Sequence, residues 1–254
     1  MRTILIVGIG AGEADFLTLQ AIAAMQRARV IFLPDKGEEK GGLNEIRLQL
    51  LERAVPDGGY RLVPFEVPER RPAATPAYKG SIADWRNALR DAYRTLFETE
   101  LADGEAGAFL VWGDPSLYDG TLTILEEMRA AGNELMVEVV PGISAPQALA
   151  AAHRIALNRV GEAVTVTTGR RVAEGHADGL SSFVVMLDSQ AGWRRFAAED
   201  AEIYWGAYLG TSDQILIAGR ISEVQDELER VRSAAQKRLG WIMDTYLIRR
   251  PERR

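Results

Sequence analysis

The chain has 254 residues, a formal charge of -6 at pH 7 and a pI near 5.2. This acidic balance argues against broad binding of nucleic acids or anionic membranes. The sequence has no cysteine, which excludes disulfides, thiolate nucleophiles and thiolate metal sites. His153 and His176 lie 23 positions apart, without the spacing of metal ligands, so we expect no metal site.

Hydrophobic residues make up 47% of the chain, enough for a sizeable core. No run approaches the roughly 18 apolar residues that a membrane span needs. The N-terminus reaches glycines before the apolar core of a signal peptide could form. We therefore expect a cytoplasmic protein with neither a membrane nor a nucleic acid as partner.

In the first half, apolar runs alternate with segments of helical periodicity. Residues 3–9 and 30–34 read as buried strands, and 16–28 between them as an amphipathic helix. This β-α-β order favours a parallel sheet. The polar, proline-rich residues 68–80 predict an exposed loop. The remaining expected elements are helices over 43–54, 82–101 and 120–131 and strands over 61–67, 108–112 and 135–140.

The segment PGISAPQ at 141–147 interrupts this pattern, so we expect an N-terminal lobe over 1–142 and a C-terminal lobe over 143–254. The second half carries more strands than helices, which predicts a mixed sheet there. The fold expected is thus α/β with two lobes. The elements predicted after the boundary are helices over 146–152, 191–198 and 222–238 and strands over 163–168, 182–187, 203–208, 214–218 and 242–248.

Two loops that follow predicted strands contain clustered glycines. In GIGAG at 8–12, Gly10 and Gly12 would let backbone approach a ligand, but Glu13 replaces the glycine of a dinucleotide fingerprint. A purely structural turn and a dinucleotide site with Asp35 on the ribose both remain open.

In GDPSLYDG at 113–120, Gly113 allows close approach, Pro115 fixes the turn and Asp114 adds an acceptor at a strand end. The alternative is that Asp114 only caps a helix or holds a turn. An apolar collar suits an uncharged aromatic group better than a triphosphate, and it consists of Val111, Trp112, Leu117 and Tyr118.

Two further loops carry candidate side chains. Ser144 lies in G-x-S-x-P, close to the nucleophile elbow of hydrolases, but its candidate base His153 is about two turns into the next helix, which favours an N-cap role. In TTGRR, Arg170 and Arg171 could clamp carboxylates or form a solvated turn. Four such loops over both halves predict a cleft between two lobes.

Taken in order, these motifs resemble the tetrapyrrole methylase family, the S-adenosylmethionine-dependent enzymes of cobalamin and sirohaem synthesis. The resemblance covers nearly the whole chain and implies two α/β lobes that hold S-adenosylmethionine between them, in a homodimer. The segments that carry it are GIGAG, DKG at 35–37, VWGDPSLYDGTLTILE, PGISAPQALAA, TTGRR, WGAYLG and MDTYLIRRP.

Within the family, these segments resemble the branch that methylates C-1 of precorrin-5 and releases acetate. Another precorrin C-methyltransferase, an NAD(P)-dependent oxidoreductase and a tetrapyrrole carrier are the alternatives. The resemblance implies cofactor contacts from Gly113, Asp114, Pro115, Tyr118, Ser144, Ala145, Met186, Tyr208 and Leu209. We also expect substrate contacts from Gly10, Gly12, Lys36, Arg170 and Arg171, and catalytic assistance from Asp35, Asp114 or Tyr118.

Overall fold

The computed structural model describes residues 1–35, 41–68 and 78–251. The chain divides into two compact units. The N-terminal unit comprises Met1–Gly10 and Ala14–Ile143, and the C-terminal unit comprises Ala11–Glu13 and Ser144–Arg254. Among the described residues, no helix has both the length and the apolar character that a membrane crossing requires.

The N-terminal unit is built on a five-stranded sheet of order β3-β2-β4-β1-β5, in which every pair is parallel. Its central strands are continuous apolar runs, as expected for a sheet covered on both faces. The strands are β1 (Arg2–Gly8), β2 (Val30–Asp35), β3 (Arg61–Glu66), β4 (Ala106–Val111) and β5 (Leu135–Val140).

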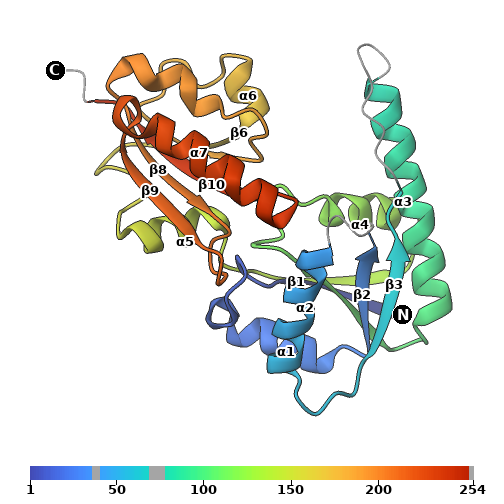
Figure 1. Ribbon diagram of the computed structural model, residues 1–254. Coiled ribbons are helices and arrows are strands. Elements are labelled where there is room, and N and C mark those ends of the chain that lie inside the picture. The colour runs from blue at the N-terminus through green and yellow to red at the C-terminus, as the bar shows by residue number, and fades with distance from the viewer. Residues whose placement is uncertain (36–40, 69–77, 252–254) are drawn as a thin grey trace. The chain divides into compact units, whose positions relative to one another are not determined.

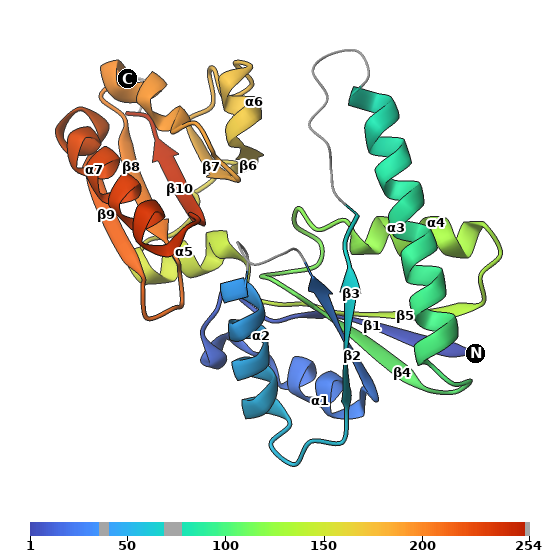
Figure 2. The same cartoon turned by 45° about the vertical axis from the view of Figure 1, so that its right-hand side comes forward.

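Helices cover both faces of this sheet (Figure 2). Side chains of α1 (Leu19–Arg27) and α2 (Gly41–Ala54) pack with Leu5 and Val7 of β1 in one core. Side chains of α3 (Tyr78–Glu100) and α4 (Thr121–Ala130) pack in a second core with Ile4 and Ile6, which point to the opposite face. The two cores make this unit a three-layer α/β structure.

The C-terminal unit contains a mixed five-stranded sheet of order β6-β7-β10-β8-β9. Only β6 and β7 pair in parallel, and the other pairs are antiparallel. The predicted α/β fold, parallel in the first half and mixed in the second, is confirmed. The strands are β6 (Thr165–Thr168), β7 (Ser182–Met186), β8 (Glu202–Ala207), β9 (Ile215–Arg220) and β10 (Asp244–Arg249).

One face of this sheet forms the main core of the unit, with Trp205 and Tyr246 fully buried against α7 (Ile221–Leu239) and neighbouring helices. On the other face lies α5 (Ala145–His153), whose Leu149 approaches Gly206 of β8. Figure 1 shows α7 running along the strands, with α5 beyond them. Helices therefore pack on both faces of this sheet.

Two helix starts differ from the sequence prediction. The predicted helix over 16–28 begins at Leu19, because Thr18 caps it through a 3.0 Å bond from Ala21 N to Thr18 Oγ1. Phe16 lies instead in a 3-10 turn and packs against Gly10. The predicted loop over 68–80 is wrong for 78–80, which belong to α3, since no proline lies between Pro76 and the end of that helix; residues 69–77 lie outside the described residues.

Two segments of the second half also differ. The predicted helix over 191–198 is a 3-10 helix, Gly192–Glu199, whose three-residue turn places buried Trp193 and Phe196 on one side. The TTGRR segment, for which a solvated turn was one of two interpretations, continues from β6 into the short helix α6 (Gly169–Ala173). Ion pairs from Arg170 and Arg171 to Glu174 favour this extra helical turn.

Candidate active site

The first candidate region is the carboxyl edge of the N-terminal sheet, where neighbouring strands β4, β1 and β5 end. From β1 the chain continues to β2 on one side, and from β4 it continues to β5 on the other side. Such a divergence between adjacent strands is a topological switch point, where open α/β sheets bind ligands. The glycine loops of the sequence lie at this edge.

Backbone packing brings three of these loops together. Gly10 and Gly113 exchange backbone hydrogen bonds of 3.2 and 2.8 Å. A Cβ added to Gly8 would lie 2.6 Å from the nitrogen of Gly142, and one added to Gly142 would lie 2.1 Å from the Gly113 carbonyl oxygen. Only glycine permits this close approach. The segments after β1, β4 and β5 therefore form one rigid cluster.

Asp114 ties two of these segments together through its carboxylate. Its Oδ2 accepts a 2.9 Å bond from Gly142 N, and its Oδ1 accepts bonds from the backbone N–H and the hydroxyl of Ser116. Burial raises the pKa of Asp114, but these hydrogen bonds outweigh it and hold the pKa below its usual value. Asp114 is therefore an ionised acceptor at neutral pH. The same carboxylate holds the turn that the sequence left as an alternative role.

Tyr118 is held in an uncommon conformation a few residues after this turn. Its φ is 57° and its side chain is 45% exposed, whereas Pro115 before it is buried. Burial of part of the ring raises the pKa of Tyr118. Left-handed conformations of non-glycine residues cost free energy and cluster at functional sites. Tyr118 therefore presents an aromatic surface at the switch point.

Ser144 starts α5, as predicted for an N-cap. Its backbone N–H and its hydroxyl both donate to Gln147 Oε1, at 2.9 and 2.8 Å. His153 lies at the far end of this nine-residue helix, about 13 Å along its axis, and its Nε2 lies 3.0 Å from the Trp205 carbonyl oxygen. A Ser144–His153 nucleophile–base pair is therefore absent. Ala145 follows as the first helical residue.

The second candidate region is one edge of the C-terminal sheet. Strands β7 and β8 both run antiparallel to β10, so their carboxyl ends meet at one edge, together with that of β6. Met186 ends β7, and Tyr208 and Leu209 follow β8. Leu187 and Tyr208 have φ values of 54° and 49°, and Leu187 is 67% exposed. Strained residues thus follow both strands.

A buried polar network lies beneath this edge. Asp188 accepts bonds from Gly192 N and Tyr246 Oη, both at 2.6 Å. Arg232 of α7 donates to the Asp188 carbonyl oxygen at 2.8 Å and to Asp244 Oδ2 at 2.9 Å. Trp205 Nε1 also donates to Asp244. The network therefore connects the end of β7, the start of β10 and the middle of β8.

The loop after β8 is fixed by bonds of its own. Tyr208 N donates to the Met243 carbonyl oxygen at 2.9 Å, and Tyr208 Oη donates to that of Trp241 at 2.5 Å. Tyr208 is itself buried, and so is Leu209. Because both side chains are buried, the cofactor contacts that the family resemblance implies for Tyr208 and Leu209 would come from their backbone groups.

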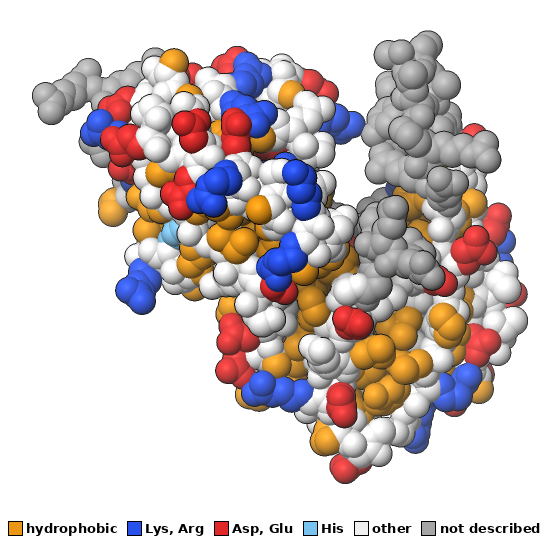
Figure 3. Space-filling model, in the orientation of Figure 1, with side chains coloured by type: hydrophobic (Ala, Val, Ile, Leu, Met, Phe, Trp, Pro, Cys, Tyr) orange, Lys and Arg blue, Asp and Glu red, His pale blue; other side chains and the backbone are white. Residues whose placement is uncertain are grey.

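The candidate substrate residues are spread over several elements. Gly10 and Gly12 have φ values of 75° and 122° in the loop after β1. Arg170 and Arg171 are exposed on α6. On the face of the C-terminal unit visible in Figure 3, basic and acidic side chains alternate without a broad basic surface. Lys36 lies outside the described residues.

Asp35, a candidate catalytic residue, is the last residue of β2 and is exposed. It pairs in register with Glu66 of β3. Within the described ranges, no three His, Asp or Glu side chains gather in a way that could hold a metal ion.

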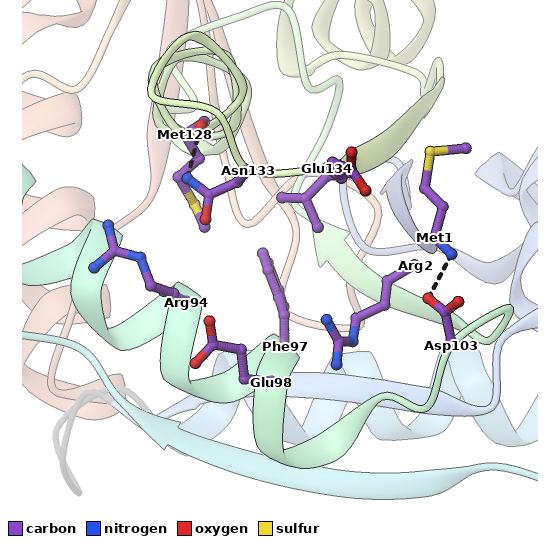
Figure 4. Close-up of a pocket in the computed structure, with 10 residues that line it drawn as sticks. Met1, Arg2, Arg94, Phe97, Glu98, Asp103, Met128, Asn133 and Glu134 are labelled. Atoms are coloured by element: carbon purple, nitrogen blue, oxygen red, sulfur yellow. Dashed lines mark hydrogen bonds and ion pairs between the residues drawn. The ribbon is translucent and has the colours of Figure 1, made fainter.

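The hollow in Figure 4 lies at the opposite, amino edge of the N-terminal sheet. It has a volume of about 180 Å³ and includes Arg2 and Leu135, the first residues of β1 and β5. A strand of six residues separates this edge from the glycine loops by about 20 Å. The hollow is therefore no part of the candidate site. Its other lining residues are Met1, Arg94, Phe97, Glu98, Asp103, Met128, Asn133 and Glu134.

Several positions at these two edges were not singled out from the sequence. Gly8 and Gly142 carry the backbone packing, and the G-x-G spacing and the PG dipeptide were their only signals. Asp188 follows a buried strand, as Asp114 does, and that shared pattern could have found it. Arg232 and Asp244 lie in ordinary helix and strand sequence, which gives no local signal.

Comparison with known proteins agrees with this architecture. Residues 3–225 match the family model of tetrapyrrole (corrin/porphyrin) methylases. The chain belongs to this family. It is 47% identical over 251 residues to a precorrin-6A synthase [deacetylating] from Sinorhizobium sp. The aligned region covers 98% of this chain and 96% of the relative.

Solved structures support the same assignment. The chain matches a cobalamin synthesis related protein, CobF, from Corynebacterium diphtheriae with a TM-score of 0.85, at 37% identity and over 99% of this chain and 100% of that one. A uroporphyrin-III C-methyl transferase from Thermus thermophilus, complexed with S-adenyl homocysteine, has a TM-score of 0.57 at 17% identity. It covers 97% of this chain and 96% of its own, and it shows the fold alone.

Proposed function

We propose that the chain is an S-adenosylmethionine-dependent methyltransferase of cobalamin biosynthesis. It methylates C-1 of precorrin-5 and releases acetate, which gives precorrin-6A. The observation that carries the proposal is the 47% identity, over 98% of the chain, to a precorrin-6A synthase [deacetylating]. The oxidoreductase alternative is disfavoured because the glycine loop does not open directly into an α-helix, as a dinucleotide site requires: α1 starts only at Leu19.

The candidate residues fit S-adenosylmethionine better than a nucleotide polyphosphate. The segments 8–18, 113–120 and 141–147 contain no lysine or arginine, so they offer no cation to a chain of phosphates. Tyr118 of the N-terminal unit supplies exposed aromatic surface, which suits an adenine ring. When bound, S-adenosylmethionine supplies a methyl group already activated by a sulfonium.

The chemistry requires positioning and one deacylation. Water adds to the acetyl carbonyl, the bond between C-1 and the acetyl carbon breaks, and the electron pair left on C-1 takes the methyl group. Acetate, two protons and S-adenosylhomocysteine are the other products. The protein therefore needs in-line placement of C-1 and the methyl carbon, and a base for water would assist.

We assign residue roles on this basis. Cofactor contacts come from Gly113, Asp114, Pro115 and Tyr118 in the N-terminal unit, and from Ser144, Ala145, Met186, Tyr208 and Leu209 in the C-terminal unit. Substrate contacts come from Gly10, Gly12, Lys36, Arg170 and Arg171. Asp35, Asp114 and Tyr118 are the candidates for assisting water, and both Asp114 oxygens already accept hydrogen bonds.

The test is a calorimetric titration with S-adenosylhomocysteine, followed by product analysis from precorrin-5. We expect a 1:1 complex, and acetate in equimolar amount with S-adenosylhomocysteine. Methylation without acetate would mean another precorrin C-methyltransferase. Binding of NADH in place of S-adenosylhomocysteine would instead support the oxidoreductase, and pigment binding without turnover would support a carrier.

Asp114→Asn is expected to weaken S-adenosylhomocysteine binding and to destabilise the fold by about 1–3 kcal/mol. The NH2 group of the asparagine would replace one of the two acceptor oxygens, so it would face the N–H donor of Ser116 or of Gly142 and that hydrogen bond would be lost. Calorimetry and thermal denaturation measure both effects. Ser116→Ala is the control, since it leaves the bond to Gly142 intact. Unchanged affinity, turnover and stability in Asp114→Asn would remove Asp114 from the mechanism.

As the family resemblance implies, we further propose that the enzyme is a cytoplasmic homodimer. Analytical ultracentrifugation of the purified chain would show a single species of twice the 28.0 kDa chain mass, and a monomer at working concentrations would contradict it.

A further inference from the structure

Arg47 of α2 is a cation at the carboxyl edge of the N-terminal sheet, and the roles assigned above do not include it. Its Nε donates to the Leu110 carbonyl oxygen at 3.0 Å, and its Nη1 donates to Asn44 Oδ1 at 2.9 Å. Asn44 in turn donates to the Pro34 carbonyl oxygen at 3.0 Å. The first turns of α2 thus bridge the ends of β2 and β4.

The guanidinium occupies a gap that the sheet itself creates. Pairing of β4 with β1 continues to Val111, but pairing of β4 with β2 stops at Phe109. Residues along a strand point their backbone groups alternately to either side. Val111 accepts from Ile9 on the β1 side, so the carbonyl of Leu110 faces β2, where the strand partner is missing. The Arg47 guanidinium takes the place of the missing strand partner. Its acceptor, Leu110, lies three residues before Gly113.

Among the described residues, the charge of Arg47 has no close counterion. Both of its hydrogen-bond partners are neutral, and no ion pair joins it to a carboxylate of the described residues. Burial lowers the pKa of Arg47, and the charge of Asp119 offsets this only in part. A desolvated cation without an anion is costly, and buried charges are normally paired. Elsewhere in the fold, the half-buried Arg86 pairs with Glu127.

One nitrogen remains available for a ligand. Nη2 of Arg47 makes no hydrogen bond to any described residue, and it is not among the fully enclosed nitrogens that lack a partner. It therefore reaches the surface. A guanidinium held at Nε and Nη1, with Nη2 open, is preorganised for a carboxylate or another planar anion.

We propose that Arg47 binds a peripheral carboxylate of the tetrapyrrole substrate beside the switch point. This inference rests on the proposed function, which makes the substrate a macrocycle with several carboxylates. Arg47 lies on a helix of the N-terminal unit. It would bind substrate in addition to Arg170 and Arg171, the exposed arginines that the sequence suggested as substrate contacts.

Arg47→Gln tests the proposal, because glutamine can still donate to Leu110 but carries no charge. We expect KM for precorrin-5 to rise about tenfold or more. The KM for S-adenosylmethionine, the calorimetric Kd for S-adenosylhomocysteine and Tm should stay close to wild type. The rise should shrink at high salt, which screens the lost attraction. Arg47→Lys should recover part of the affinity for precorrin-5.

Arg53→Gln is the matched control, since Arg53 lies on the same helix but pairs with Asp15 at the exposed surface. It should leave both KM values unchanged. An unchanged KM for precorrin-5 in Arg47→Gln would overturn the proposal. A parallel loss of Tm and of affinity for both ligands would overturn it too, because Arg47 would then only brace Leu110. If wild type itself neither binds S-adenosylhomocysteine nor releases acetate, the proposed function fails first.

Discussion

Replacing Gly142 by alanine is expected to cost about 3 kcal/mol or more in the free energy of unfolding and to abolish S-adenosylhomocysteine binding. The new methyl carbon would lie 2.1 Å from the Gly113 carbonyl oxygen, and 2.8 and 2.9 Å from backbone atoms of Gly8. All three contacts are with backbone at the carboxyl ends of neighbouring parallel strands, so no rotation of a side chain can relieve them. The segments after β1, β4 and β5 must therefore separate.

Urea denaturation followed by circular dichroism measures the loss, and calorimetry measures the affinity. Gly120→Ala is the control, because a Cβ there meets nothing within 4 Å and the residue has a φ of -94° that alanine adopts readily. We expect its stability to change by no more than about 0.5 kcal/mol. Wild-type stability in Gly142→Ala would mean that the three segments are not packed as described.

The fold was largely predictable because its strands are long apolar runs. Residues 3–9 and 108–112 had no alternative to burial between two layers, and the helical spacing between strands dictated parallel pairing. Helix ends were less predictable, because they depend on single contacts. Thr18 moves the start of α1 to Leu19 by capping it, and the apolar periodicity that begins at Phe16 does not reveal that choice.

The candidate site was predictable in its motifs but not in its supporting contacts. GDPSLYDG and PGISA mark strand ends through glycine, proline and aspartate, whose backbone requirements are local. The bond from Gly142 to Asp114 spans 28 residues, and Arg47 reaches a carbonyl 63 residues away. Such contacts depend on strand order and on where pairing stops, and neither is encoded near the residues concerned. The assigned roles of the candidate residues stay predictions.

Removal of the Arg232 side chain is the second change with a large expected effect. Arg232→Met should cost about 3–5 kcal/mol in the free energy of unfolding, because it leaves Asp244 as a buried carboxylate without its cation. The Asp188 carbonyl also loses its donor. Since this network underlies Met186 and Tyr208, S-adenosylhomocysteine should bind more weakly as well. Arg194→Met, which breaks an exposed pair with Glu229, should change stability by no more than about 1 kcal/mol.

The loss in Arg232→Met should depend on pH in a defined direction. Burial raises the pKa of Asp244, and Arg232 opposes that rise, so the variant raises this pKa further. A folded-state pKa above the unfolded one means that stability is retained below the unfolded pKa and lost as pH rises through the folded pKa. The deficit relative to wild type should therefore be larger at pH 8 than at pH 5 in urea denaturation.

The double variant Arg232→Met, Asp244→Asn is the control for this pH dependence. It keeps an acceptor for Trp205 without the charge, so it should recover stability and lose the pH dependence. A deficit that stays constant with pH, or a double variant less stable than Arg232→Met, would show that the Asp244 charge is not the cause.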